Sequence, residues 1–300
     1  MQIEKLHVPV MLNEVLEFLN PQPGQIIVDA TLGTGGHALE ILRRISPGGR
    51  LIGIDRDENS LAVCQQRLAE FKGSVEFVHA NFSQLDEVLE ARGIKEIDGI
   101  IFDLGISTYQ LADAQRGFSF KEEGPLDMRL DKNSYISAYD LVNNLNENEI
   151  SALLWNFGQE RWHNRIAHLL VQERRNEPIA TTTQLANLVM RAIPHRYRRS
   201  YYRIHPATRT FQAVRIAVNR ELEVLESTVK KAVDILRKQS RICVISFHSL
   251  EDRVIKHTFR ALKSSGLINI VTAKPLTPRW AEVEANPSSR SSKFRVAERA

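Results

Sequence analysis

Short apolar segments alternate with amphipathic stretches between residues 26 and 103 of the chain. Each apolar segment is rich in Ile or Val, which is typical of buried strands, and stretches with apolar residues at helical spacing separate the segments. This alternation indicates a parallel sheet covered by helices on both faces, which places the chain in the α/β class. The four strands predicted here span residues 26–30, 51–55, 75–79 and 97–103.

The alternation stops after the fourth strand. Helical periodicity returns at 150–155, 166–174 and 183–192, and we predict one long helix over 207–238. A buried strand at 242–247 and two late strands near 268–272 and 294–297 then follow. The pattern predicts a Rossmann-like sheet domain formed by residues 1–110 and 207–300, interrupted by an inserted all-helical domain over 111–206.

Composition excludes several classes of protein. The 300 residues are 43% hydrophobic and 25% charged, as in ordinary globular domains, and no apolar run approaches the roughly 20 residues that span a bilayer. The N-terminus has an early acid, Glu4, and no long apolar core, so we predict no signal peptide. Cys64 and Cys243 lie in apolar stretches without a partner at metal-ligand spacing, which argues against a disulfide or a zinc site. We therefore expect a soluble, cytoplasmic protein without membrane attachment.

A glycine-rich turn follows the first predicted strand. Gly33, Gly35 and Gly36 let the backbone turn tightly and approach a ligand, and His37 stands at the start of the next helix. Asp55 ends the second predicted strand, where a carboxylate can accept hydrogen bonds from ribose hydroxyls. The alternative is a glycine turn that binds nothing. The combination of strand, glycines, helix and strand-terminal acid favours a nucleoside ligand.

The spacing of the glycines and the acid at Asp29 indicate which nucleoside. Dinucleotide-binding proteins use G-x-G-x-x-G, which directs helix N–H groups at a pyrophosphate. Here the spacing is G-x-G-G, and Asp29 precedes the loop. A carboxylate suits the cationic amino and sulfonium groups of S-adenosylmethionine and disfavours a dianionic pyrophosphate.

The chain resembles a known family, the bacterial 16S rRNA cytosine-N4 methyltransferases called RsmH or MraW. The resemblance runs essentially end to end and depends on several long motifs. They span His7–Val10, Asp29–His37, Asp103–Ser107, Arg116–Phe120, Gly124–Arg129, His205–Ala213, Ser246–Arg253 and Asn286–Ser291.

This resemblance implies a class I methyltransferase sheet and transfer of a methyl group from S-adenosylmethionine to the exocyclic N4 of a cytidine in the decoding centre of 16S rRNA, within the small ribosomal subunit. The chain departs from the family pattern at Thr108, Tyr109 and Ala112, and its segment 274–285 is shorter than in many members of the family. The cofactor-binding residues that the motifs imply are Gly35, Gly36, His37, Asp55, Phe82, Asp103 and Gln110. We add the loop glycine Gly33 to them.

Asp103, at the end of the fourth predicted strand, is the one candidate for a catalytic role. The cytosine amine is a poor nucleophile because its lone pair is delocalised, and an acceptor that draws on an N–H helps the transfer. Asp103 lies at the sheet edge where open α/β sheets bind ligands. A general base is one hypothesis for it, and a contact with the cofactor is the favoured one.

Two further groups of residues allow more than one interpretation. Phe118 and Phe120, beside Arg116, suit stacking on an extruded base, or they are core aromatics. His248 and Glu251 belong to a predicted capping box over Ser249–Asp252, or they line a substrate pocket.

No Asp or Glu occurs between Glu177 and Glu221, whereas arginines are frequent there and Tyr197, Tyr201 and Tyr202 lie among them. Arginine with interleaved aromatics is a common way to hold RNA, and a run without counter-charge favours an anionic partner over a merely solvated face. The predicted RNA-binding residues are Arg116, Phe118, Arg191, Arg196, Arg198, Arg199 and Arg203.

Two rival functions remain at this point. A non-catalytic RNA-binding or ribosome-assembly factor with a vestigial cofactor fold is disfavoured by the intact glycine loop with Asp55. A nicotinamide-dependent oxidoreductase is disfavoured by the glycine spacing.

Overall fold

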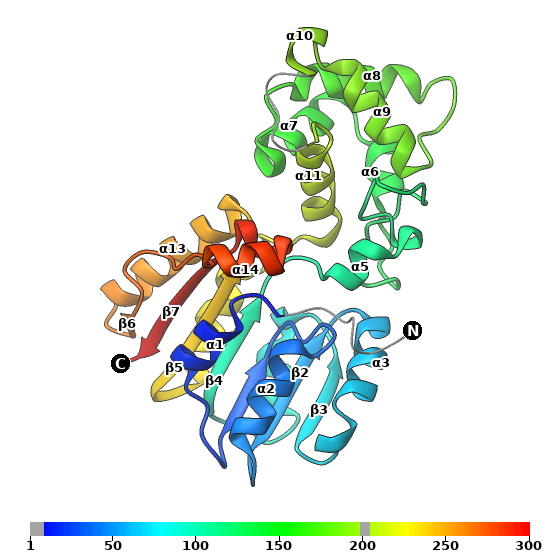
Figure 1. Cartoon of the computed structure of the whole chain (residues 1–300). Coiled ribbons are helices and arrows are strands. Elements are labelled where there is room, and N and C mark those ends of the chain that lie inside the picture. Colours follow the sequence, from blue (N-terminus) through cyan, green and yellow to red (C-terminus); the bar gives the residue numbers. More distant parts are fainter. Residues whose placement is uncertain (1–8, 199–204) are drawn as a thin grey trace. The chain divides into compact units, whose positions relative to one another are not determined.

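The structure is a computed structural model that describes residues 9–198 and 205–300. The chain forms two compact units, each described here by itself (Figure 1). Residues 1–109 and 222–300 form the sheet unit, and residues 110–221 form the helical unit. The inserted unit therefore extends to residue 221, beyond the predicted end at 206, because helix α11 (Thr208–Asn219) packs on α7 (Glu147–Gly158).

The sheet unit contains one seven-stranded sheet with the strand order β3-β2-β1-β4-β5-β7-β6. Strands β1 to β5 are parallel, and β7 is antiparallel to both β5 and β6. This topology confirms the predicted Rossmann-like sheet, with all seven predicted strands present. The strands are β1 (Ile26–Asp29), β2 (Arg50–Asp55), β3 (Val75–His79), β4 (Ile97–Asp103), β5 (Leu236–Ser246), β6 (Ile268–Ile270) and β7 (Lys293–Arg299).

Helices cover both faces of this sheet (Figure 1). On one face α1 (Leu12–Leu19), α2 (Gly36–Ile45) and α3 (Glu58–Arg67) bury their apolar residues. On the other face α4 (Leu85–Glu90), α12 (Leu225–Ile235) and α13 (Ser249–Ser264) do the same. Because both faces of the strands are buried, the strands are continuous apolar runs, which explains why they could be recognised in the sequence.

The helical unit contains α6 (Ala138–Asn144), α7, α8 (His163–Glu173), α9 (Thr182–Ala192), α10 (His195–Arg198) and α11, and α5 (Thr108–Ala112) crosses the boundary. Three of these helices begin with a capping box, at Ser137, Asn146 and Thr181. In each box the side chain three residues into the helix bonds back to the cap, so two free N–H groups of the first turn are satisfied.

The prediction of a single long helix over 207–238 is wrong. The structure has two helices there, α11 and α12, and β5 already begins at Leu236. Arg220 ends α11 in the left-handed conformation with a φ of 50°, and a run of apolar residues at helical spacing does not reveal such a stop. Helices α1, α6 and α14 (Trp280–Ala285) were also not predicted. Among the described residues, no helix has the length and apolar character that a membrane span requires.

Candidate functional site

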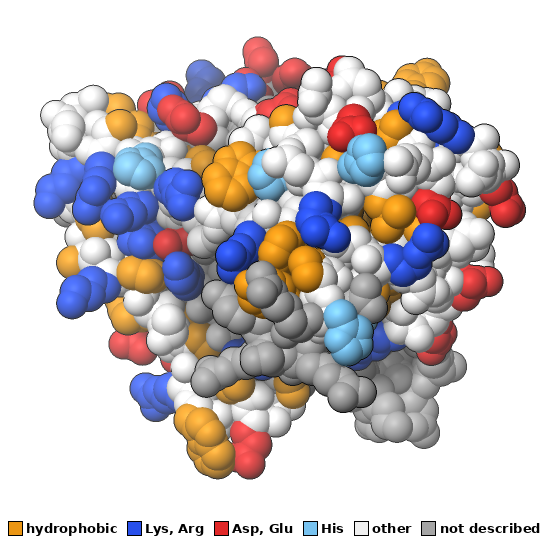
Figure 2. Space-filling model, turned by 90° about the horizontal axis from the view of Figure 1, so that it is seen from above, with side chains coloured by type: hydrophobic (Ala, Val, Ile, Leu, Met, Phe, Trp, Pro, Cys, Tyr) orange, Lys and Arg blue, Asp and Glu red, His pale blue; other side chains and the backbone are white. Residues whose placement is uncertain are grey.

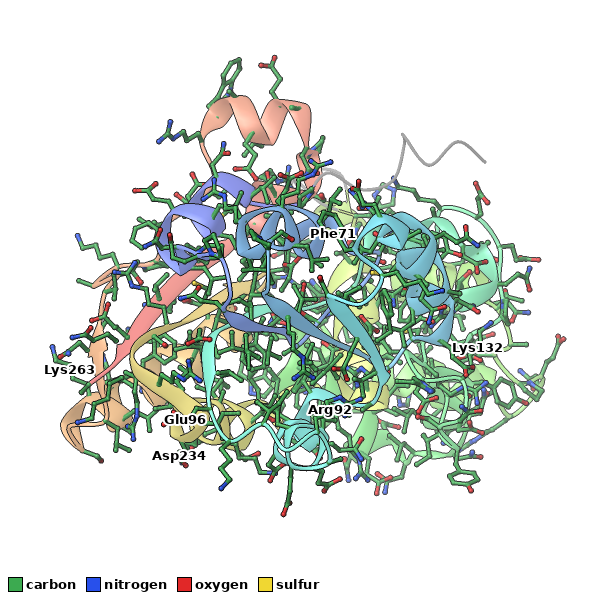
Figure 3. The ribbon with its side chains drawn as sticks, turned by 90° about the horizontal axis from the view of Figure 1, so that it is seen from below. Phe71, Arg92, Glu96, Lys132, Asp234 and Lys263 are labelled. Carbon is green, nitrogen blue, oxygen red and sulfur yellow. The ribbon has the colours of Figure 1, made fainter. Side chains whose placement is uncertain are left out.

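Three aspartates end neighbouring strands at one edge of the sheet. Asp29 ends β1, Asp55 ends β2 and Asp103 ends β4. Because β1 pairs with both β2 and β4 in parallel register, these carboxyl groups lie at the same edge, where open α/β sheets bind ligands. The view from below in Figure 3 shows the opposite edge, where Glu96 and Asp234 lie.

The glycine loop between β1 and α2 has the geometry that only glycine allows. Gly33 has a φ of 52° and Gly35 a φ of 80°, both in the left-handed region. A Cβ atom on Gly35 would lie 2.5 Å from the Sγ atom of Cys64 on α3. The loop is therefore held close against α3, and the first N–H groups of α2 remain without a side-chain cap.

Asp55 holds this loop to the end of β2. Its Oδ2 accepts the N–H of Gly33 at 2.7 Å, and its Oδ1 accepts the N–H of Asp57 at 2.8 Å. A carboxylate oxygen has two lone pairs, so each oxygen keeps one for a ligand hydroxyl. Asp55 thus has a structural role that the sequence did not indicate, and its geometry still permits the predicted ribose contact.

Asp103 is partly buried and incompletely bonded. Its N–H donates to the Oγ1 atom of Thr31 at 2.6 Å, which ties the end of β4 to the glycine loop. Its Oδ1 is buried and has no hydrogen-bond partner among the described residues. Burial, together with the nearby carboxylates of Asp29 and Glu251, raises the pKa of Asp103 well above its usual value. A ligand that donates an N–H to Oδ1 would relieve this unmet acceptor.

His37 faces Asp103 from the first turn of α2. Its Nε2 is 2.9 Å from the carbonyl oxygen of Val10, so Nε2 carries a hydrogen and donates it. Its Nδ1 is 3.6 Å from Oδ2 of Asp103. His37 therefore joins the first turn of α2 to Val10, and its predicted contact with the cofactor stays a prediction.

Asp29 adds a third acid to this edge. Its side chain is buried, and Oδ1 accepts the N–H of Thr31 at 3.2 Å. Desolvation by burial raises its pKa to about 7, and the nearby charge of Asp55 adds to the shift. Carboxylates gathered at one sheet edge favour a bound cation, which would stabilise their ionised forms.

The raised pKa of Asp29 predicts a pH-dependent stability. The folded protein holds a proton on Asp29 up to about pH 7, whereas the unfolded chain loses it near 3.8. The free energy of unfolding should therefore fall as the pH rises from 5 to 8, by about 2–3 kcal/mol from this group. Urea titrations of the wild type and Asp29→Asn at both pH values check this. The difference between the two proteins should change by that amount, and a constant difference would contradict the prediction.

Helix α13, which follows β5, contributes a fourth acid, Glu251, in its first turn. Its Oε2 accepts the N–H groups of Phe247 at 2.9 Å and His248 at 3.3 Å, while its own N–H donates to Nδ1 of His248. The capping box of α13 therefore begins at His248, one residue before the predicted Ser249. This network accounts for Glu251 and for Nδ1 of His248, whereas Nε2 of His248 is buried without a hydrogen-bond partner among the described residues, 3.2 Å from Oε1 of Glu251. A role for these side chains in a substrate pocket stays a prediction.

Six of the predicted cofactor residues lie together at one edge of the sheet: Gly33, Gly35, Gly36, His37, Asp55 and Asp103. A seventh, Phe82, follows β3 in the short helix Phe82–Gln84 and packs edge-to-face on Phe102, with ring centroids 6.0 Å apart. Gln110 is buried in the helical unit, so its cofactor role stays a prediction. Thr31 was not among the predicted residues, because its only signal in the sequence is its place in the turn after β1.

Comparison with known proteins identifies the family. The profile of the MraW methylase family matches residues 4–300. A ribosomal RNA small subunit methyltransferase H from Clostridioides difficile (strain 630) is 43% identical over 308 residues, covering 98% of each chain. The protein of that name from Geobacter sp. (strain M21) is 46% identical over 308 residues, with the same coverage. The chain belongs to the MraW methylase family. This confirms the family resemblance that its motifs indicated.

Two side chains of this MraW-family methylase that were predicted to contact RNA are buried. Arg116 is 2% exposed, and its Nη2 donates to the carbonyl oxygens of Arg129 and Leu130. Phe118 is 6% exposed and lies beneath the Arg116 guanidinium, with 5.6 Å to the ring centroid. Their role is to hold the 116–130 segment in place, so we withdraw them as RNA contacts. The nearby Phe120 packs between His205 and Phe211.

The arginine-rich segment of the methylase is only partly described. Arg191 is exposed and forms an ion pair with Glu173 of α8, at 2.7 Å. Its counter-charge therefore comes from another helix, which corrects the inference that the segment lacks one. The side chains of Arg196 and Arg198 lie outside the described residues, as do Arg199 and Arg203 altogether. Their RNA contacts stay predictions.

Proposed function

We propose that the chain transfers a methyl group from S-adenosylmethionine to the exocyclic N4 of a cytidine in the decoding centre of 16S rRNA, as a cytoplasmic enzyme acting on the small ribosomal subunit. The observation that carries this proposal is the buried, unpartnered Oδ1 of Asp103 at an edge that also holds Asp29, Asp55 and the glycine loop. The names of the relatives, which are small-subunit rRNA methyltransferases, support 16S rRNA as the substrate.

The residues at this edge fit S-adenosylmethionine. The loop 33–36 lets a ligand come close to its backbone, Asp55 keeps lone pairs for ribose hydroxyls, and an ionised Asp29 offsets a positive charge. When bound, the cofactor supplies an electrophilic methyl group on a cationic sulfur. A nicotinamide dinucleotide fits poorly, because its pyrophosphate would meet these carboxylates.

The chain's own part in the reaction is to orient and activate the cytosine amine. A carboxylate oxygen at Oδ1 of Asp103 accepts one amine N–H, which raises electron density on N4 and directs its lone pair. Thr31 fixes the backbone of Asp103, and His37 lies beside Oδ2. The neighbouring acids Asp29 and Glu251 favour proton uptake by Asp103, since they raise its pKa. Asp103 is thus the proposed catalytic residue.

A methyl-transfer assay tests the proposed function. Purified protein, tritiated S-adenosylmethionine and either free 16S rRNA or small subunits from cells lacking this gene should yield labelled RNA. The same RNA from cells that carry the gene is the matched control, and it should accept far less label because its site is already methylated. Cofactor binding without label in either substrate would contradict the proposal and support a non-catalytic factor.

Replacing Asp55 with Ala should weaken the binding of S-adenosylmethionine. Hydrogen bonds to a charged group contribute roughly 1.5–3 kcal/mol, which corresponds to about ten- to a hundred-fold in affinity. Because Asp55 also holds Gly33, thermal unfolding must first show that the variant is folded. Calorimetric titration then measures affinity, and an unchanged value in a folded variant would rule out the ribose contact.

A further inference from the structure

Helix α13 carries a row of basic side chains on its outer face. Arg253, Arg260 and Lys263 are exposed and Lys256 is half-buried, with the exposed His257 beside it. The positions follow each other at intervals of three or four residues, about one helical turn, so they share one face. Ten residues separate the first from the last, which is about 15 Å along the helix. We call Arg253, Lys256, Arg260 and Lys263 the α13 stripe.

The α13 stripe is not neutralised. None of its four cations has an acidic partner among the residues that the structure describes. The two acids of α13, Glu251 and Asp252, are buried in its first turn, where Asp252 binds Lys293 and Arg295.

Several exposed arginines elsewhere on the sheet unit are paired, whereas Lys72, Lys95 and Lys238 are exposed without an ion pair among the described residues and lie in separate segments. Arg43 binds Glu40, Arg50 binds Glu76, and Arg237 binds Asp98. Figure 2 shows Lys and Arg side chains gathered at the left of the view, the side on which Figure 1 draws α13. The stripe differs from these isolated lysines because its four cations share one face of a single helix.

The stripe begins beside the candidate site. Helix α13 starts directly after β5, at the edge where Asp29, Asp55 and Asp103 lie. It ends near the opposite edge, and Figure 3 shows Lys263 at the periphery. A polyanion bound along the stripe would therefore lead toward the site.

We propose that the α13 stripe binds consecutive phosphates of the RNA backbone and guides the strand that carries the target base; this inference rests on the proposed function. Lys and Arg in a row without acids are the usual means of binding phosphates independently of sequence. An anionic membrane is the other polyanion to consider. A membrane-binding helix needs exposed apolar residues, and those of α13, including Ile255, Phe259 and Leu262, are buried against the sheet.

The test is a triple variant, Lys256→Gln, Arg260→Gln and Lys263→Gln, with a matched control. The control, Lys72→Gln, Lys95→Gln and Lys238→Gln, removes the same charge from exposed lysines near the starts of β3, β4 and β5, at the opposite edge. Binding to a 16S rRNA transcript is measured over a range of salt concentrations.

For the stripe variant, the slope of log affinity against log salt should fall in magnitude by about two, at about 0.7 per phosphate contact. Affinity at 0.1 M salt should fall by up to about a hundredfold, since each contact contributes about fivefold there. The control should match the wild type, and all three proteins should bind S-adenosylmethionine equally and melt at similar temperatures.

The outcomes separate this inference from the proposed function. A wild type that methylates 16S rRNA, with a stripe variant of unchanged affinity and slope, overturns the stripe alone. A wild type that never methylates rRNA overturns the proposed function. If the stripe and control variants lost RNA affinity equally, net charge alone would explain the loss, and the inference would be overturned. The inference would also be overturned if the wild type bound vesicles of phosphatidylcholine and phosphatidylserine, the stripe variant did not, and both bound RNA equally.

Discussion

Asp103→Asn is expected to lower kcat by about a hundredfold or more while leaving the affinity for S-adenosylmethionine within a few-fold of the wild type. The amide keeps the size of the side chain but removes the negative charge that accepts the amine proton. Losses of this size are typical when a positioned proton acceptor or a charge-stabilising group is removed. Steady-state methylation of 16S rRNA at saturating cofactor measures kcat, and calorimetry measures affinity.

Asp234→Asn is the matched control for this variant. It makes the same chemical change on an exposed aspartate at the opposite edge of the sheet, seen from below in Figure 3, and should leave both quantities unchanged. If Asp103→Asn instead weakened cofactor binding and left turnover intact at saturation, Asp103 would be a cofactor contact only.

Gly35→Ala should destabilise the folded protein strongly. Its φ of 80° costs a residue with a Cβ about 1–2 kcal/mol, and the added Cβ would lie 2.5 Å from Sγ of Cys64. Overpacking of this kind typically adds 1–3 kcal/mol, so the total is about 2–5 kcal/mol. Urea unfolding measures the loss directly.

Two further variants separate the strain from the clash. Gly24 has a φ of 85°, but a Cβ added there would meet nothing within 4 Å, so Gly24→Ala should lose the backbone part alone. The double variant Gly35→Ala with Cys64→Ala removes the clashing sulfur and should recover part of the loss. If Gly35→Ala were no worse than Gly24→Ala, the loop would not be held closely against α3.

The sheet was predictable because its strands are buried on both faces. Segments such as 26–29 and 97–103 are apolar runs with turn residues on either side, and no tertiary information is needed to recognise them. The end of α11 was not predictable, because it depends on Asn219. That side chain binds the carbonyl oxygen of Met128 and the N–H of Leu130, far away in sequence.

The candidate site was predictable where its acidic residues lie at the ends of apolar strands. Asp55 and Asp103 could be placed because each directly terminates an apolar run. The burial of Arg116 could not, because its partners are backbone carbonyl groups, which leave no trace in side-chain identity. The ion pair of Arg191 with Glu173 shows the same limit, since a charge run in sequence says nothing of acids that the fold brings near it.

Mass-spectrometric mapping of 16S rRNA shows directly whether the chain methylates a decoding-centre cytidine at N4. RNA from cells lacking the gene is compared with RNA from the same cells complemented by the wild type or by Asp103→Asn. We expect an N4-methylated cytidine in the decoding centre with the wild type, its absence without the gene, and little or none with the variant. An unchanged set of methylated nucleotides in all three samples would contradict this expectation.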